Sequence, residues 1–340
     1  MPLRDGDLWA ITSYFNPMSY SRRRQNYQCF RSALGVPLLA VELSDSEHYE
    51  LQSADADIVV RTASRSVLWQ KERLLNVALQ HLPAHVEYVA WLDCDVIFER
   101  QDWHVAATSE LRKRPVIQLF ASRSDLQRDE SYRGNHSTEV VSTQCSFAKH
   151  VSTSSLITDG PAPPDARPIW NFDSGFAWAA RRELLNRHGF YDAMVMGSGD
   201  LAMACAAFGT MAVAAQFSRL NEAQSRHYES WAAAFHRDVA ANVGYLEGRI
   251  IHLWHGERFR RRYIQRHVEF SKMAFDPRTD LRINETGAFE WADGRDDLNR
   301  FAVEYFRSRL EDGAQWLQKS IPKSGVADDH SSAPRIEPNL

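Results

Sequence analysis

Residues 87–92 (EYVAWL) form a nearly continuous apolar run, and two acids, Asp93 and Asp95, follow it directly. A short run of this kind is typical of a parallel strand that is buried on both faces. In open α/β sheets, ligands bind at the carboxyl ends of the strands. Carboxylates one residue apart in an extended chain point to the same side, so we expect Asp93 and Asp95 to approach one cation.

Two carboxylates at such a position suit a hard divalent cation. Mg²⁺ and Mn²⁺ prefer oxygen ligands and commonly share them with substrate phosphates. A cation held there would neutralise the charge that develops on a departing nucleotide diphosphate. An Asp-x-Asp sequence also occurs by chance in surface turns, but its position directly after a buried strand favours the cation site.

The rest of the sequence alternates apolar, strand-like runs with helical patterns. Further strands are expected over residues 8–13, 37–43, 57–61, 115–121, 176–180 and 249–254. Helices are expected over residues 19–34, with Ser19 as N-cap, and over 67–82, 181–188, 201–208 and 285–317. Strands that alternate with helices predict βαβ units, and therefore an α/β fold with a mostly parallel central sheet flanked by helices.

The sequence also suggests a division of the chain. We expect one domain over residues 1–280, a C-terminal helical extension over 281–320 and a disordered tail over 321–340, because the tail is polar and contains proline. Residues 123–168 are rich in Ser and Thr and carry the turn-forming run DGPAPPDARP. Much of this segment is therefore predicted to be a long loop or flap.

Composition excludes some classes of protein. A formal net charge of −4 argues against wholesale attraction to nucleic acid. The 4 cysteines are widely spread and contain no C-x-x-C pair, which favours reduced thiols over a disulfide framework or a Cys-based zinc site. The N-terminal segment has no apolar signal region, and no run of about 18 apolar residues occurs anywhere. These features predict a cytoplasmic protein without integral membrane association.

Two histidines, His252 and His255, follow the apolar start of the predicted strand over 249–254. Because Gly256 is expected to end this strand, the chain can turn between them. His255, at the edge of the loop, is then the better candidate metal ligand, and His252 is the second. Either histidine can instead pack against Trp254 and bond locally.

The next segment, residues 257–266 (ERFRRRYIQR), is strongly basic and contains two aromatic residues. It can hold a diphosphate as a fork of guanidinium groups, with Arg258 as a candidate. It can also contact nucleic-acid phosphates, and a solvated helix face is the ordinary alternative for any run of charges.

Asp200 follows the glycines of G-S-G and stands at the start of a predicted helix. It can be the N-cap of that helix, or a general base that deprotonates an acceptor hydroxyl. Asp173 and Gly175, in N-F-D-S-G, are comparable. They can contact a sugar hydroxyl or form a turn.

In this order, the motifs resemble those of GT-A glycosyltransferases, and the second half of the chain resembles the galactosyl/N-acetylgalactosaminyltransferase group. In that group a D-x-D motif, here residues 93–95, ends the nucleotide-binding half of the domain. A later glycine-bearing strand and turn contacts the donor sugar, and residues 171–176 (NFDSGF) match it. A G-x-G-acid element follows, matched by residues 197–200, and then a metal-binding histidine, matched by His255.

The resemblance implies a GT-A (Rossmann-like) fold, a UDP-sugar donor and a Mn²⁺ or Mg²⁺ ion. It implies metal ligands at Asp93, Asp95, His255 and His252. Gly199 and Asp200 would bind the acceptor, and the carboxylate is the base in inverting members. The family usually carries consecutive acids there, whereas Leu201 and Ala202 follow Asp200. Donor contacts are expected from Thr12, Ser13, Tyr14, Arg22, Arg23, Arg24, Gln70, Arg73, Asp173, Gly175 and Arg258.

The sequence therefore predicts a metal-dependent hexosyltransferase that moves a hexose or N-acetylhexosamine from a UDP-sugar to an acceptor hydroxyl, with inversion. The acceptor can be a glycan, another hydroxyl-bearing molecule or a modified nucleic acid. One alternative is a sugar nucleotidyltransferase, which usually carries a glycine-rich basic loop after its first strand. The stretch TSYFNPMSYSRRR contains no glycine. Another alternative is a nucleotide- or nucleic-acid-binding protein that uses residues 257–266.

Overall fold

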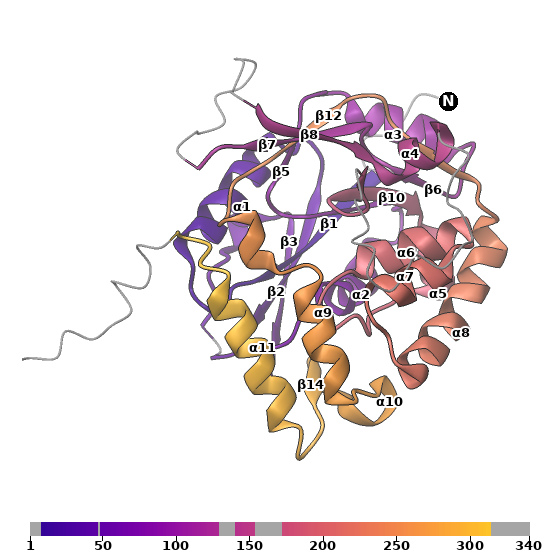
Figure 1. Cartoon of the computed structure of the whole chain (residues 1–340). Coiled ribbons are helices and arrows are strands. Elements are labelled where there is room, and N and C mark those ends of the chain that lie inside the picture. Colours follow the sequence, from indigo (N-terminus) through magenta and orange to yellow (C-terminus); the bar gives the residue numbers. More distant parts are fainter. Residues whose placement is uncertain (1–7, 47, 129–139, 154–171, 314–340) are drawn as a thin grey trace, which may run out of the picture.

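Two β-sheets form the centre of the protein, which a computed structural model describes for residues 8–46, 48–128, 140–153 and 172–313 (Figure 1). The larger sheet contains, in spatial order, β11 (Val243–Tyr245), β6 (Val116–Gln118), β10 (Ala177–Arg181), β4 (Tyr88–Leu92), β1 (Leu8–Phe15), β2 (Leu38–Ser44) and β3 (Ile58–Ala63). β1 to β4 are mutually parallel, and β10 is antiparallel to both of its neighbours. This mostly parallel sheet confirms the predicted α/β class.

The central strands of this sheet are apolar because helices cover both of their faces. Every residue of β2 is buried, and only the first residue of β4 is partly exposed. On one face, Ile11, Val41 and Trp91 pack in a single cluster with α2 (Lys71–His81), α6 (Gly199–Phe208) and α8 (Glu222–Val239). On the other face, Ala10 and Leu92 pack with α1 (Ser21–Ala33) and α3 (Trp103–Leu111). Continuous apolar strands are expected where a sheet is buried in this way.

The second sheet stands at the carboxyl end of β4. It contains, in spatial order, β5 (Val96–Phe98), β12 (Arg249–His252), β7 (Ser122–Leu126), β8 (Val140–Ser146) and β9 (Phe172–Asp173). β12 is antiparallel to β5 and parallel to β7. Because β5 begins only a few residues after β4, the Asp93–Asp95 segment is the direct link between the two sheets.

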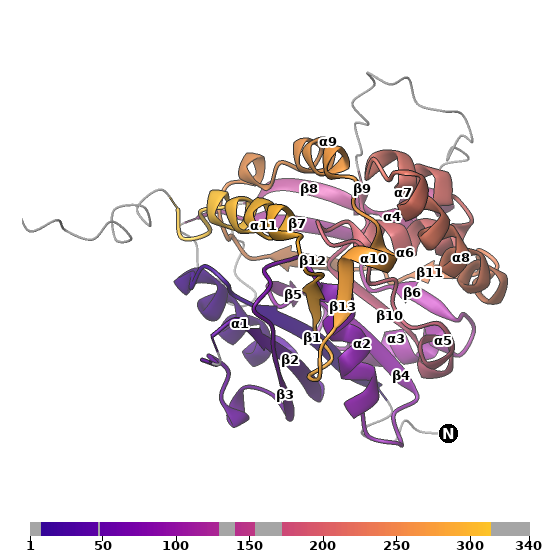
Figure 2. The same cartoon turned by 90° about the horizontal axis from the view of Figure 1, so that it is seen from below.

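The remaining elements are short. They are α4 (Phe147–Thr153), α5 (Arg182–His188), α7 (Met211–Phe217), α9 (Gln265–Phe270), α10 (Pro277–Asp280), α11 (Asp296–Ser308), the hairpin β13 (Leu281–Ile283) and β14 (Phe289–Trp291), and the 3₁₀ helices η1 (Ser53–Asp55), η2 (Arg258–Arg261) and η3 (Ser271–Met273). In Figures 1 and 2, α9 and α11 lie side by side, and Arg266 of α9 donates to the Tyr305 hydroxyl of α11 at 2.6 Å. In the described part of the chain, no helix is both long and apolar enough to cross a membrane.

The prediction of a long loop over residues 123–168 is wrong for the residues that the structure describes. They include most of β7, all of β8 and α4. The polar composition is misleading because Arg123 and Ser124 are buried in the second sheet, where Arg123 forms an ion pair with Asp173 at 2.7 Å. Residues 129–139 and 154–171 of this segment lie outside the described residues.

Two expected features of the helices also need correction. The predicted helix over 285–317 is wrong in its first part, because β14 occupies residues 289–291 and α11 begins only at Asp296. Ser19 is not the N-cap of α1, which begins at Ser21. The free backbone N–H groups of Ser21 and Arg22 are instead satisfied by the Asp312 carboxylate, at 3.0 and 2.7 Å. The expected tail, 321–340, lies outside the described residues.

Candidate metal centre and adjoining acid cluster

The pairing of the second sheet brings the late histidines to the acids that follow β4. β12 lies between β5 and β7, and His252 is its last residue. The backbone N–H of Leu253 donates to the carbonyl oxygen of Asp95 at 2.9 Å. This contact fixes the His252–His255 turn against the Asp93–Asp95 link.

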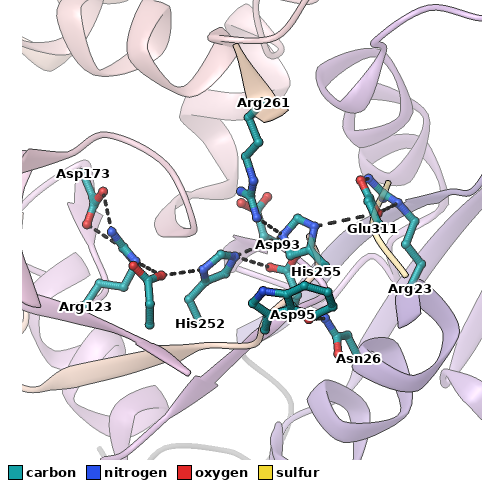
Figure 3. A network of polar contacts seen from close by, with 12 residues as sticks. Arg23, Asn26, Asp93, Asp95, Arg123, Asp173, His252, His255, Arg261 and Glu311 are labelled. Atoms are coloured by element: carbon teal, nitrogen blue, oxygen red, sulfur yellow. Dashed lines mark hydrogen bonds and ion pairs between the residues drawn. The ribbon is translucent and has the colours of Figure 1, made fainter. Parts of the chain in front are cut away.

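Asp95, His252 and His255 form one buried cluster (Figure 3). The Nε2 atom of His255 lies 3.0 Å from Oδ2 of Asp95 and 3.1 Å from Nε2 of His252. The Nε2 atom of His252 lies 3.9 Å from Oδ1 of Asp95. Both imidazoles are 6% exposed. One ligand atom from each of the three residues lies within 4.8 Å of the others, so they can reach a common ion.

Carboxylates on the far side of each imidazole orient these nitrogen atoms. Nδ1 of His252 lies 2.8 Å from Oδ1 of Asp125, and Nδ1 of His255 lies 3.7 Å from Oε2 of Glu311. Burial lowers the pKa of His252 to about 4, against the opposing effect of Asp125, so this imidazole is neutral at pH 7. If its Nδ1–H donates to Asp125, its Nε2 lone pair faces the cluster. Histidines that bind metals commonly have this carboxylate partner.

The residues present fit a divalent cation. Nε2 of His255 accepts a hydrogen bond from Arg261 at 2.7 Å, so its lone pair is directed at that guanidinium, which a bound cation would replace. Oδ1 of Asp95 is buried and has no hydrogen-bond partner among the described residues. A cation at this place would satisfy the Asp95 oxygen and the His252 lone pair, and it would bind His255 in place of Arg261.

Asp93 lies outside this cluster, contrary to the expectation that it points with Asp95 to one ion. Residues 94 and 95 form a turn, so the link is not extended and its two carboxylates diverge. Nζ of Lys71 lies 2.5 Å from Oδ1 of Asp93 and 2.7 Å from Oδ2 of Asp200. Burial would lower the pKa of Lys71, but the two carboxylates outweigh it and raise that pKa. Lys71 is therefore a charged bridge between the two acids.

Asp200 is not the N-cap of α6. The helix begins at Gly199, and the preceding Ser198 has left-handed backbone (φ 75°) with no capping side chain. The Asp200 carboxylate turns instead toward Lys71. Burial and then Asp93 raise its pKa, while Lys71 opposes them. A carboxylate with a raised pKa is a stronger base, as a general base requires.

Two glycines allow the carboxyl groups of Asp200 and Glu72 to pack closely against the backbone. A Cβ atom on Gly175 would lie 3.0 Å from Oδ2 of Asp200. A Cβ atom on Gly199 would lie 2.1 Å from Oε1 of Glu72, so any larger residue there would displace the Glu72 carboxyl. Glu72 is 2% exposed, and neither of its carboxyl oxygens has a hydrogen-bond partner among the described residues. Burial, and then Asp200, raise its pKa to about 8.

Two cavities meet at the histidines. One has a volume of about 110 Å³ and lies at the carboxyl ends of β1 and β4, where Ser13, Lys71 and Asp93 line it. The other has a volume of about 450 Å³ and lies beside β7 and η2. Phe176, His252, His255 and Arg261 line both cavities. Phe176 also has left-handed backbone (φ 77°), a strained conformation of the kind that clusters at functional sites.

Several expected donor contacts are placed away from these cavities. Thr12 has no exposed surface and donates to the carbonyl of Leu92 at 2.7 Å, so a nucleotide contact does not fit its position. Tyr14 is buried and donates to Glu50. Arg73 donates to the carbonyl of Gly287 at 2.7 Å, and Arg22 lies over the Trp254 ring at 5.4 Å. Each side chain has a partner within the fold.

Other expected donor residues do line a cavity. Ser13, Arg23 and Gln70 line the smaller one, although Gln70 is 2% exposed and accepts from the backbone of Phe289 at 2.8 Å. Asp173 and Arg258 line the larger one. Asp173 is already held by Arg123. Gly175 lies beside Asp200, as described above.

Sequence reasoning missed several members of the site. These are Lys71, Glu72, Arg123, Asp125, Arg261 as a partner of His255, and Glu311. Only Lys71 left a usable signal, since it begins a helix whose first turn faces the carboxyl ends of the strands. Asp125 lies in a polar stretch that contains no recognisable motif. Glu311 follows α11, far along the chain from the other residues of the site.

No known family model matches the sequence, and no curated protein matches it. Among solved structures, glucosyl-3-phosphoglycerate synthase from Mycobacterium tuberculosis, in complex with Mn²⁺, uridine diphosphate and phosphoglyceric acid, is 12% identical with a TM-score of 0.39, over 84% of this chain and 86% of that one. A Drosophila β1,4-galactosyltransferase 7 mutant in complex with manganese, UDP-Gal and xylobiose is 11% identical with a TM-score of 0.37, over 87% and 98%.

A third solved structure is 4-diphosphocytidyl-2C-methyl-D-erythritol synthase from Anaerococcus prevotii. It is 11% identical with a TM-score of 0.34, over 72% of this chain and 88% of that one. Values this low assign no activity to the chain.

Proposed function

We propose that the protein is a metal-dependent GT-A glycosyltransferase, of the galactosyl/N-acetylgalactosaminyltransferase type, that uses a UDP-sugar donor. It transfers a hexose or N-acetylhexosamine to an acceptor hydroxyl with inversion. The observation that carries this proposal is the convergence of Asp95, His252 and His255 at the carboxyl end of β4, between two cavities. The donor class follows from the order of the sequence motifs.

The cation in this proposal is Mn²⁺ or Mg²⁺. Asp95, His252 and His255 would hold it, and Asp93 contributes through its bridge to Lys71 rather than as a ligand. When bound, the ion would supply positive charge against the negative charge that develops on the departing UDP. Mixed imidazole and carboxylate donors are compatible with these ions, of which Mn²⁺ is the better match to imidazole.

Asp200 is the catalytic base in this mechanism. Its carboxylate accepts the proton of the acceptor hydroxyl while the acceptor oxygen forms a bond to the anomeric carbon of the donor sugar. The bond between that carbon and the diphosphate oxygen breaks, and its electron pair leaves with UDP. Lys71 holds Asp200 in place through the 2.7 Å contact, and Gly175 lets the backbone approach the Asp200 carboxylate closely. Positioning of this kind is a large part of such catalysis.

The alternatives fit the described residues less well. The residues between β1 and α1 contain no glycine-rich loop, and Asp312 already bonds the N-terminus of α1, where a nucleotidyltransferase would bind phosphate. Three arginines of the basic segment have partners within the fold. Arg261 contacts His255, Arg262 pairs with Glu269, and Arg266 bonds Tyr305. This use of the arginines reduces the surface available for nucleic acid.

The test is release of UDP from a panel of UDP-hexoses and UDP-N-acetylhexosamines, with Mn²⁺, with Mg²⁺ and with a chelator. We expect one donor to be consumed only when a divalent cation is present. Asp200→Asn should lower the rate at least about 100-fold, within the usual range for loss of a general base, with little change in UDP affinity. Asp102→Asn, at an exposed residue remote from the cluster, is the matched control. Consumption that persists in chelator, or an active Asp200→Asn variant, would contradict the proposal.

A further inference from the structure

The larger cavity has room for a ligand beyond the donor. Its volume of about 450 Å³ is in the range of small-molecule sites. Two of its lining residues, Arg123 and Asp173, lie on the opposite side of His252 from Arg23 and Glu311 (Figure 3). If the smaller cavity at the ends of β1 and β4 receives the nucleotide, the larger cavity is left for the acceptor. The following inference rests on the proposed function in this respect.

The charges in this cavity are unevenly distributed. The carboxylates of Asp125 and Asp173 are engaged by Arg123, which is 2% exposed, and Asp125 is also held by His252. Two carboxylates against one guanidinium leave a single negative charge in this group, and both carboxylates are held in ion pairs.

Two further arginines that line the cavity, Arg128 and Arg258, form no ion pair among the described residues. Arg258 donates to the neutral side-chain oxygen of Gln144 at 3.1 Å. The guanidinium of Arg128 lies over the Trp254 ring, 5.3 Å from its centre. Glu257 also lines the cavity, but it is exposed and forms no ion pair within the described ranges. Arg128 and Arg258 therefore keep most of their hydrogen-bonding capacity.

A guanidinium group presents its N–H donors in a planar fork that matches the two oxygens of a carboxylate or phosphate. Trp254 supplies a flat apolar face beside this fork, and flat aromatic faces suit the apolar surface of a sugar ring. Asp200 lines neither cavity, but Phe176 lines both, and Lys71 of the smaller cavity contacts Asp200 at 2.7 Å. An acceptor anchored in the larger cavity would therefore pass Phe176 to approach the base.

We infer that the acceptor is an anionic sugar or glycan end, whose phosphate or carboxylate is bound by Arg128 and Arg258 while its hydroxyl is directed past Phe176 to Asp200. The two arginines are specificity residues for the acceptor. They take no part in holding the donor nucleotide.

The experiment measures binding to the full chain by calorimetry with Mn²⁺ and UDP at saturating concentration, so that the donor phosphates already occupy their site. The probes are a hexose 6-phosphate, a hexuronate and the unmodified hexose. The variants are the double substitution Arg128→Gln with Arg258→Gln, and Arg260→Gln as the matched control. Arg260 lies in the same segment but outside the cavity lining, against the ring of Phe259.

We expect at least one anionic probe to bind about tenfold or more tightly than the neutral hexose, since a charge-assisted bond of this kind carries at least that factor. Preference for the phosphate or for the uronate identifies the anion. The double variant should lose the preference and keep its affinity for UDP, whereas Arg260→Gln should change neither.

Equal binding of the neutral hexose, no binding of either anionic probe, or a double variant that keeps the preference would overturn the inference. Loss of UDP binding in the double variant would overturn it as well, because it would assign the arginines to the donor. These results are distinguishable from failure of the proposed function, in which wild-type protein would bind no UDP before any sugar is added.

Discussion

Glu72 has an environment that differs strongly from that of a carboxyl group in water. It is 2% exposed, has no hydrogen-bond partner among the described residues, and has a pKa raised to about 8. In the folded protein the carboxyl therefore keeps its proton over the interval from about 4.3, its usual pKa, to about 8. The stability that this proton uptake contributes is complete below that interval and is lost as the pH rises through it.

The substitution Glu72→Gln removes this titration. We expect the variant to gain free energy of unfolding relative to wild type as the pH rises from 5 to 9, by on the order of 4 kcal/mol, because glutamine cannot ionise. Urea unfolding in chelator at several pH values measures the difference. Glu110→Gln, at a side chain that is 31% exposed on α3, is the control and should follow the wild-type curve. Parallel curves for Glu72→Gln and wild type would show that Glu72 ionises normally.

At the level of single residues, part of the candidate site could be predicted from the sequence. Asp95 and the two histidines could be identified because a strand end and a short motif mark them. The divergence of Asp93 from Asp95 could not, because it depends on the turn at 94 and 95. Nor could the bridging role of Lys71, since its contacts with Asp93 and Asp200 join residues 22 and 129 positions away.

Among the elements, α1 depends on a residue from the other end of the described chain. Its first N–H groups are bonded by Asp312, which follows α11, and its own N-terminal region supplies no cap. We expect Asp312→Ala to lower the free energy of unfolding by about 1 kcal/mol, the usual cost of losing a cap. Asp293→Ala, at an acid whose side chain is 89% exposed, is the matched control and should have little effect in the same urea titration. An unchanged midpoint for Asp312→Ala would show that water replaces the cap at no cost.

Elements with apolar patterns were predictable, and elements with polar patterns were not. β2 and β4 were found because burial on both faces demands apolar runs. β7 was not, because its buried Arg123 and Ser124 are compatible with a strand only through partners such as Asp173 on β9. The longest described helix, α8, was also absent from the prediction, although its apolar face packs on α6.

In the molecule as a whole, the second sheet brings the residues of the candidate site together. A mostly parallel sheet was predicted, and Asp93 and Asp95 follow the carboxyl end of its central strand β4. The strand β12 then brings His252 to that edge through pairing with β5 and β7, and α11 leads the chain back to place Glu311 beside His255. Pairings between residues so far apart in the chain leave no periodic pattern in the local sequence, so they could not be predicted. The division at residue 280 and the cytoplasmic location stay predictions.

The central claim, a nucleotide-diphosphate site built on Asp95, His252 and His255, is tested most directly by calorimetric titration of UDP with and without Mn²⁺. We predict UDP binding that requires Mn²⁺, exceeds the binding of GDP and ADP, and falls about 100-fold or more in Asp95→Asn, a loss of about 2.7 kcal/mol. The control Asp102→Asn should bind as wild type does. Binding of UDP that is indifferent to Mn²⁺ and to Asp95→Asn, or no binding of any nucleotide to the wild-type protein, would contradict the account.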